Sequence, residues 1–267
     1  METNSSYVNK SLDRALRLLD LFDDSRVQLT ASEIADLLGT TRATIYPTLH
    51  TMLTHGYLDR DGNGRFVLGM KIVERSGQKL AHLDVRTIAQ VHLRELARQL
   101  NANAHLATLH GNEVLYLERE QGRPAVVLRE VIGRRVSPHC TALGKALLAF
   151  LPVEDRSRIA NDLDYVAYTS RTITDPAALL RDLETVERNG YALETEEFHL
   201  GSACIAAPVR GHDGRVIAAI SVSMSLEDLS KRREELAETI RETAGRISGE
   251  LGNYKQQRHS DLEGGDS

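Results

Sequence analysis

The stretch TTRATIYPTLHTML, residues 40–53, decides the fold of the first part of this 267-residue chain. Ile45, Leu49 and Met52 recur at helical spacing, which predicts a helix with one apolar face. The other face carries short polar side chains, and positions 39–58 contain no acidic residue. Solvent-exposed helices usually carry Glu–Lys pairs, whereas a helix that enters the major groove of DNA needs short side chains that approach base edges. The stretch therefore predicts a recognition helix.

The segments on either side of this helix complete a winged helix-turn-helix. Apolar residues at three- and four-residue steps over 12–22 predict a first helix. Thr30 and Glu33 form a capping box, which predicts that a second helix begins near residue 31. The run YLDRDGNGRFVL, residues 57–68, predicts two strands whose Asp-Gly and Asn-Gly pairs supply the positive φ of a tight hairpin. We therefore expect residues 1–69 to form the DNA-binding domain.

The candidate DNA contacts lie on the outward face of the third helix or beside the hairpin tip, where Arg60 and Arg65 can reach phosphates or a minor groove. Residues 1–75 hold nine Lys/Arg against ten Asp/Glu, so the positive charge near the helix is local and modest. Helix-turn-helix proteins dock on DNA as two-fold symmetric dimers, so we expect a homodimer on an inverted repeat in double-stranded DNA. The alternative is a small helical domain with a hairpin and no DNA. The candidates are Thr41, Arg42, Ala43, Thr44, Tyr46, Pro47, His50, Thr51, Arg60 and Arg65.

Pro47 interrupts the predicted recognition helix. Proline lacks an N–H and clashes with the carbonyl four residues earlier, which costs ~3 kcal/mol inside a helix. Two geometries remain open at this stage. Either the helix kinks at Pro47, or it begins a turn later with Thr44 as its N-cap, which places Pro47 in the tolerant first turn.

The composition, with 41% hydrophobic and 27% charged residues, is that of a soluble globular protein with two domains. No apolar run approaches the ~20 residues of a membrane span, and METNSSYVNK lacks the features of a secretory signal. We therefore expect a cytoplasmic protein that does not contact the membrane. Cys140 and Cys204 lie in no ligand spacing, so we expect free thiols, no metal and no cofactor.

The remainder of the chain predicts a helical linker over residues 70–82, a second domain over 83–254 and a polar tail over 255–267. Helices and strands are mixed in the second domain, with helices at both sequence ends of a sheet, so the predicted class is α+β. The predicted strands cover 104–109, 113–120, 125–131, 202–209 and 215–224. The predicted helices cover 84–99, 142–151, 176–190 and 225–251.

Four separated motifs of this domain resemble one known family. HCTALGKALLAFLP at 139–152, GYALETEEF at 190–198, CIAAPV at 204–209 and VIAAISVS at 216–223 are similar to the effector domain of the IclR family of bacterial transcription regulators. The resemblance implies a GAF-like ligand-binding domain, dimers or dimers of dimers, and a small-molecule effector that alters operator binding. TIYPTLH, residues 44–50, also resembles the recognition helix of PadR regulators, whereas the IclR family commonly carries Arg at the position of Pro47.

The resemblance also implies where the effector binds. Strand alternation directs the two serines of 220–224 to one face of the sheet. The residues alone would place this face in water. In IclR-like sensors, the matching positions line the effector pocket. In these sensors a cysteine and an acidic residue also line the pocket. The acidic residue is often Asp, whereas this chain has Glu at that position. Backbone amides at the helix after residue 139 favour an anion, so the expected effector is a small organic acid. The predicted effector residues are Ala142, Leu143, Glu194, Cys204, Ser221 and Ser223.

Two other classes of protein compete with the regulator. A cysteine-dependent enzyme would use Cys204 as nucleophile and His139 or His199 as base. The apolar strand around Cys204 favours a packing role or contact with a ligand instead. A winged helix would also have no function in such an enzyme. A protein-interaction scaffold that needs no effector is the third class. We therefore predict a regulator without catalytic residues.

Overall fold

The computed structural model describes residues 8–23, 25–81, 84–122 and 132–252. The chain divides into two compact units, Met1–His82 and Leu83–Ser267. In the described ranges, no helix has both the length and the apolar character that a membrane span requires.

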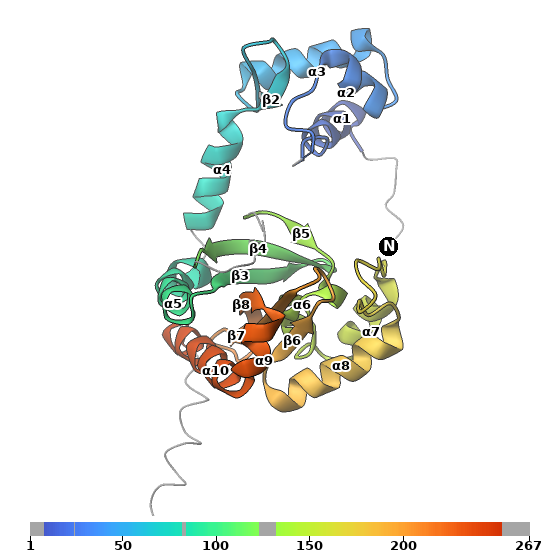
Figure 1. Ribbon diagram of the computed structural model, residues 1–267. Helices are drawn as coiled ribbons and strands as arrows, with labels where there is room; N and C mark the ends of the chain where they lie inside the picture. The colour runs from blue at the N-terminus through green and yellow to red at the C-terminus, as the bar shows by residue number, and fades with distance from the viewer. Residues whose placement is uncertain (1–7, 24, 82–83, 123–131, 253–267) are drawn as a thin grey trace, which may run out of the picture. The chain divides into compact units, whose positions relative to one another are not determined.

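The first unit is a winged helix-turn-helix followed by a helix (Figure 1). Its core joins three helices to the hairpin through Leu18, Ile34, Ile45, Leu49 and Phe66, all of which are buried. This is the apolar face that the helical spacing predicted. The elements are α1(Lys10–Leu19), α2(Ala31–Leu37), α3(Arg42–Thr54), β1(Leu58–Arg60), β2(Phe66–Leu68) and α4(Met70–Ala81).

The predicted start of α2 is confirmed. The Thr30 amide donates to Glu33 Oε2 at 2.6 Å, and the Glu33 amide donates to Thr30 Oγ1 at 3.2 Å, so both halves of the capping box are present. Gly39 follows the helix with a φ of 63°. A left-handed residue directly after a helix ends the helical hydrogen bonding and turns the chain toward the next helix.

One of the two geometries considered for Pro47 is not found in the recognition helix. Thr41 is the N-cap of α3, and its Oγ1 accepts the Thr44 amide at 3.2 Å. The alternative in which the helix begins a turn later with Thr44 as its cap is therefore wrong. Pro47 lies inside the helix and has no N–H to donate to the carbonyl of Ala43. The Thr51 hydroxyl donates to the Pro47 carbonyl at 2.8 Å, which adds a side-chain bond to this part of the helix.

The hairpin forms at the predicted place, and of the two predicted pairs Asn-Gly supplies a positive φ. Gly64 has a φ of 77°, whereas Gly62 does not have a positive φ, so the Asp-Gly pair does not supply the left-handed residue. Instead the Asp61 carboxylate accepts the amides of Asn63 and Arg65 at 2.9 and 2.8 Å. A side chain that replaces backbone acceptors in this way stabilises the loop without a second left-handed residue.

The second unit is built on a six-stranded antiparallel sheet with the strand order β5-β4-β3-β8-β7-β6 (Figure 1). The strands are β3(Asn103–His110), β4(Glu113–Glu120), β5(Arg135–Val136), β6(Ala192–Thr195), β7(Ser202–Arg210) and β8(Val216–Ser225). The helices are α5(Asp84–Leu100), the 3₁₀ helix η2(Pro138–Cys140), α6(Ala142–Leu148), α7(Val153–Asp162), α8(Pro176–Asn189), α9(Leu226–Lys231) and α10(Arg233–Glu250). The α+β class is as predicted.

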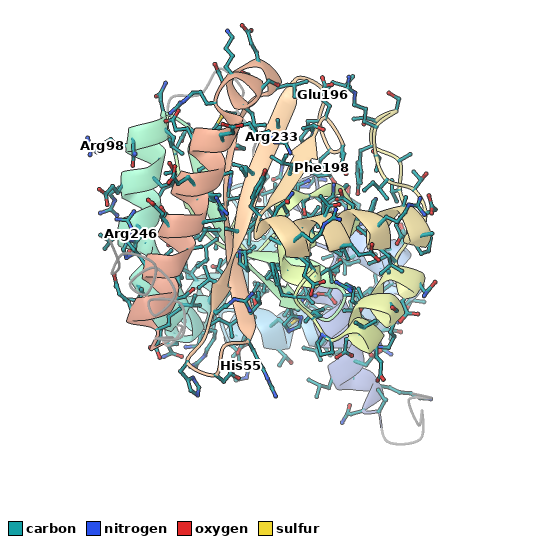
Figure 2. All side chains as sticks on the ribbon, turned by 90° about the horizontal axis from the view of Figure 1, so that it is seen from below. His55, Arg98, Glu196, Phe198, Arg233 and Arg246 are labelled. Atoms are coloured by element: carbon teal, nitrogen blue, oxygen red, sulfur yellow. The ribbon has the colours of Figure 1, made fainter. Side chains whose placement is uncertain are left out.

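Each face of this sheet packs on its own set of helices. Ile220 of β8 belongs to a core shared with α5 and α10, and its neighbour Ala219 belongs to a second core shared with α6, α7 and α8. The predicted alternation along β8 is therefore confirmed. Figure 2 shows α5 and α10 side by side, with Arg98 and Arg246 directed away from the sheet.

Several boundaries depart from the sequence-based prediction. The closing helix is divided at Arg232 into α9 and α10, although Ser225 caps its start as expected. The helix expected over 142–151 ends at Leu148, and α7, β5 and β6 were not predicted. The polar sequence of α7 offers little periodic signal. The strand expected over 125–131 and the tail over 255–267 lie outside the described residues.

Candidate functional site: a recognition helix and a buried pocket

The outward face of α3 presents the predicted DNA contacts to solvent. The apolar face, with Ile45, Leu49 and Met52, is buried against the rest of the first unit. Short side chains on the opposite face leave the helix backbone accessible, which is what approach to base edges requires. The predicted contacts on this face, all of which are exposed, are Thr41, Arg42, Ala43, Thr44, Tyr46, Pro47, His50 and Thr51.

The three predicted arginines are in different states. The exposed Arg42 has no hydrogen bond or ion pair within the described part of the chain. Arg65 Nη2 lies 3.1 Å from Glu33 Oε1, so Arg65 already has a carboxylate partner. Arg60 donates to the Gly64 carbonyl at 2.8 Å, and its guanidinium lies 4.5 Å from the centre of the Phe66 ring. Arg42 is therefore the cation that a phosphate can engage without breaking an existing contact.

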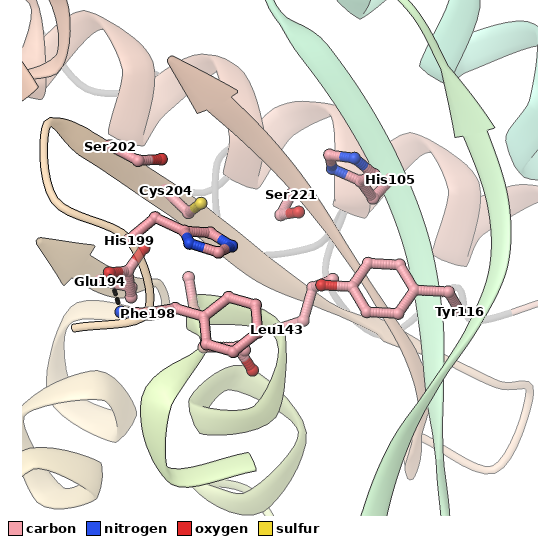
Figure 3. Close-up of a pocket in the computed structure, with 11 residues that line it drawn as sticks. His105, Tyr116, Leu143, Glu194, Phe198, His199, Ser202, Cys204 and Ser221 are labelled. Atoms are coloured by element: carbon pink, nitrogen blue, oxygen red, sulfur yellow. Dashed lines mark hydrogen bonds between the residues drawn. The ribbon is translucent and has the colours of Figure 1, made fainter. Parts of the chain in front are cut away.

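The predicted effector residues gather at one pocket on the α6 side of the large sheet (Figure 3). Five of the six line it, and the sixth, Ser223, lies beside Cys204 in the β7–β8 pairing. The cavity volume is about 20 Å³, which is of the order of one water molecule. The lining residues are His105, Tyr116, Thr141, Ala142, Leu143, Glu194, Phe198, His199, Ser202, Cys204 and Ser221.

The start of α6 is positioned by Thr141 and Gly144. Thr141 Oγ1 accepts the Gly144 amide at 3.0 Å and caps the helix. A Cβ at Gly144 would lie 2.3 Å from Pro138 Cα, so only glycine lets η2 pack on this turn. The amides of Ala142 and Leu143 belong to the first turn, where N–H groups have no acceptor within the helix. This end of the pocket therefore offers backbone donors.

Glu194 shapes the opposite wall. Its Oε1 accepts the amides of Glu197 and Phe198 at 2.6 and 3.2 Å, and its carboxyl also hydrogen-bonds the Cys204 thiol. Burial raises the pKa of Glu194 to about 7 in spite of these hydrogen bonds. The carboxyl therefore holds the loop 196–201, which carries Phe198 and His199 into the pocket (Figure 3).

A buried ion cluster lies behind this loop. Lys145 of α6 is 1% exposed, and its Nζ lies 2.6 Å from Glu197 Oε1 and 2.9 Å from Asp182 Oδ2. Burial opposes the charged form of Lys145, but the charges of Glu197 and Asp182 outweigh it and keep its pKa above the usual value. The cluster joins α6, α8 and the loop, so movement of the loop disturbs the start of α6.

Of the two bases considered for Cys204, His199 lines the same pocket as the thiol. The Cys204 thiol hydrogen-bonds the carboxyl of Glu194, and a negative charge on that carboxyl opposes a thiolate beside it. His139 does not line the pocket; its ring bonds Ser137 Oγ at 2.7 Å and the Val166 carbonyl at 3.1 Å, and burial lowers its pKa. Burial also raises the pKa of the Cys140 thiol to about 12. Both cysteines are free, and the described residues include no group of three or more His, Cys, Asp or Glu that could hold a metal.

Six residues that line the pocket were not predicted to bind the effector, although His199 was considered as a base for Cys204. Ser202 precedes Cys204 by two positions and shares its face of β7, so strand alternation alone could have identified it. His105 likewise alternates along β3. The loop residues Phe198 and His199 have no periodic signal, because their position depends on the bonds to Glu194. The six are His105, Tyr116, Thr141, Phe198, His199 and Ser202.

Comparisons with known proteins agree with this arrangement. Residues 77–249 match the family described as bacterial transcriptional regulator IclR C-terminal, and residues 11–62 match the IclR helix-turn-helix domain. The HTH-type transcriptional regulator XynR of Escherichia coli is 38% identical over 215 residues, which are 80% of this chain and 85% of XynR. KipR of Bacillus subtilis is 32% identical over 246 residues, 91% of this chain and 98% of KipR. The crystal structure of an IclR homolog from Microbacterium hydrocarbonoxydans complexed with 4-hydroxybenzoate has a TM-score of 0.82 and 30% identity, covering 90% of this chain and 98% of the homolog.

Proposed function

This chain belongs to the IclR family of bacterial DNA-binding transcriptional regulators, and we propose that it binds an inverted-repeat operator as a homodimer under the control of a small organic acid. The observation that carries the proposal is the pairing of an exposed, acid-free recognition helix with a buried polar pocket in one chain. A bacterial operator lies in the cytoplasm, so this is the compartment we propose. Residues 1–69, 70–82 and 83–254 are assigned to DNA binding, connection and effector binding.

The proposed DNA contacts are the eight exposed candidates between Thr41 and Thr51 together with Arg60 and Arg65. Arg42 is expected to contribute most to phosphate binding, because it has no competing contact among the described residues. Arg42→Ala and Arg65→Ala should weaken binding nearly equally across sequences and reduce its salt dependence. Thr44→Ala or His50→Ala should instead reduce discrimination at one base pair. Fluorescence anisotropy with selected operators at several salt concentrations measures both quantities. If Arg65→Ala changed specificity but left the salt dependence unchanged, the proposed role of the hairpin would be wrong.

The proposed effector is a small organic acid bound between the first turn of α6 and the serine-bearing face of β8. The amides of Ala142 and Leu143 offer donors to a carboxylate, and Ser221 adds a hydroxyl. The related structure is a complex with 4-hydroxybenzoate, which supports a small organic acid as the effector. Because the cavity is about 20 Å³, such an acid requires the loop 196–201 to move outward. We propose that this movement is how binding is communicated to the rest of the second unit.

Titration calorimetry with a panel of small organic acids tests the effector proposal. The double variant Ser221→Ala with Ser223→Ala should lose most of the affinity, since both hydroxyls are proposed to bond the acid and a charge-assisted bond from Ser221 to its carboxylate alone contributes ~1.5–3 kcal/mol. Its DNA binding without effector should stay close to that of the wild type, because neither serine belongs to the winged helix. An acid that binds both proteins equally and still changes operator affinity would show that the effector site lies elsewhere.

Cys204→Ser tests the regulator against the enzyme. The variant should keep DNA binding and change the effector response, because the side chain lines the pocket beside Glu194. Turnover of an ester or thioester by the wild type that disappears in Cys204→Ser would contradict the proposed function.

A further inference from the structure

One row of polar residues crosses four strands on the pocket side of the large sheet. Asn103 of β3 pairs with Ser223 of β8, Ser223 pairs with Cys204 of β7, and Cys204 pairs with Glu194 of β6. Their neighbours along the strands, such as Ala104 and Val222, belong to the core on the opposite face. The four polar side chains therefore share the face that carries the pocket.

Residues on two sides of this row line the pocket. His105 and Ser221, which pair with each other, form the next row on the same face. Cys204 and Ser202 flank Ser223 from β7. Side chains directly opposite each other in an antiparallel pair lie ~5 Å apart, so Asn103 and Ser223 directly continue the pocket wall.

Three residues of this region are buried and carry polar side-chain atoms without a partner among the described residues. Asn103 is 0%, Ser202 1% and Ser223 2% exposed. In the described part of the chain, Asn103 Nδ2 and Oδ1, Ser202 Oγ and Ser223 Oγ have no hydrogen-bond partner. Buried polar atoms in folded proteins are almost always bonded, and leaving an amide and two hydroxyls unpaired is costly. Such a cluster beside a ligand pocket indicates groups that a ligand completes.

We propose that Asn103, Ser223 and Ser202 form a second polar end of the effector pocket, which binds an uncharged hydroxyl group of the effector. This rests on the proposed function and deepens it, because it makes the effector a hydroxy acid instead of a simple carboxylate. The carboxylate binds at the first turn of α6, and the hydroxyl binds at the Asn103 end.

The chemistry of the row selects a hydroxyl. An amide offers two donors and one acceptor group, and a hydroxyl can donate to its oxygen while accepting from its nitrogen. A ligand carbonyl could only accept, which would leave Asn103 Oδ1 unpaired. An ionised carboxylate also can only accept, so it too would leave Asn103 Oδ1 unpaired.

Paired acids that differ by one hydroxyl test the proposal by titration calorimetry at constant pH. The pairs are 4-hydroxybenzoate with benzoate and 4-hydroxybutyrate with butyrate. The wild type should bind at least one hydroxy acid tenfold or more tightly than its partner, which corresponds to ~1.4 kcal/mol. Asn103→Leu should bring the hydroxy acid to the affinity of the plain acid. The matched control Asn161→Leu changes an exposed residue of α7 and should keep the difference.

Thermal unfolding of the same variants without ligand gives a readout that does not depend on the choice of acid. If Asn103 serves the ligand, Asn103→Leu should leave the melting temperature unchanged or raise it, because a buried unpaired amide is removed. A clear drop in melting temperature would show that Asn103 is structural or bonds a buried water, and would overturn the proposal. So would a wild type that binds acids without discriminating within either pair. If no acid binds the wild type at all, the small-acid effector fails, and the melting temperature alone decides the role of Asn103.

Discussion

The recognition helix and the effector pocket both rely on short polar side chains, but in opposite environments. Thr44 and His50 on α3 are exposed, so water satisfies their polar atoms before DNA arrives. Ser221 and Ser223 in the second unit are 2% exposed, and the hydroxyl of Ser223 has no partner in the described residues. Solvated polar groups cost little stability, whereas buried ones lower it until a partner is present.

This difference predicts how the two sites respond to substitution. At the DNA-binding face, loss of a polar group should reduce function and leave stability unchanged. Around the pocket, loss of a buried polar group should change both, in a direction set by whether the group has a partner. Lys145 has two carboxylate partners, whereas the side chain of Asn103 has no partner among the described residues, so these two residues mark the extremes.

The largest expected effect is at Lys145. Lys145→Ala leaves Glu197 and Asp182 buried or half-buried without a cation and should destabilise the second unit by ~3–5 kcal/mol. Urea unfolding followed by circular dichroism measures the loss. The control Lys71→Ala removes a lysine of an exposed pair and should leave the unfolding midpoint nearly unchanged. A Lys145→Ala protein as stable as the wild type would remove the distinction between buried and exposed polar groups.

The burial of Glu194 should make the free energy of unfolding depend on pH. Because burial raises its pKa from 4.5 to about 7, the folded protein holds a proton that the unfolded chain releases between these values. The free energy of unfolding therefore falls as pH rises from 4.5 to 7 and then levels off. At ~1.36 kcal/mol per pH unit, the charged carboxylate costs roughly 3 kcal/mol at pH 8.

Glu194→Gln removes this cost and keeps an oxygen for the amides of Glu197 and Phe198. The variant should gain stability over the wild type at pH 8 and gain little at pH 4.5, as measured by unfolding at both values. Glu113→Gln, at a surface pair, is the control and should show no such trend. A stability difference that does not vary with pH would show that Glu194 titrates normally.

Pro47 lies inside α3, where it cannot donate a backbone hydrogen bond. Pro47→Ala restores an N–H that can bond the Ala43 carbonyl, so α3 should gain roughly 1–3 kcal/mol. Hydrogen exchange of the α3 amides in the full chain measures this gain, with amides of α5 as the internal reference. Unchanged protection in α3 would mean that the helix absorbs the proline without cost.

The smallest effect is expected at Glu33, where the two roles of one side chain can be separated. Glu33→Gln retains the capping box but releases Arg65 from its carboxylate partner. Non-specific DNA affinity should rise about two- to fivefold, with a steeper salt dependence. Glu235→Gln, which frees Arg232 in the second unit, should leave DNA affinity unchanged. Unaltered affinity of Glu33→Gln would show that Arg65 does not contact DNA.

Sequence alone determined the features that depend on local order. Capping by Thr30 and Glu33, the helical period through Ile45 and Leu49, and the alternation along β8 follow from residues a few positions apart. For that reason the winged helix-turn-helix, the α+β class and the shared face of Ser221 and Ser223 were predictable. The residues alone favoured water for that face, and only the family resemblance placed Ser221 at the pocket.

Tertiary structure decided whatever depends on residues that are distant in the chain. Arg65 meets Glu33 across 32 positions, and Lys145 meets Glu197 across 52, so no local pattern announces either pair. The same holds for the row that brings Asn103 beside Ser223, because strand order and register assemble it from separate parts of the chain. Burial then determines which of these polar groups water can no longer satisfy, and burial is a property of the folded chain alone.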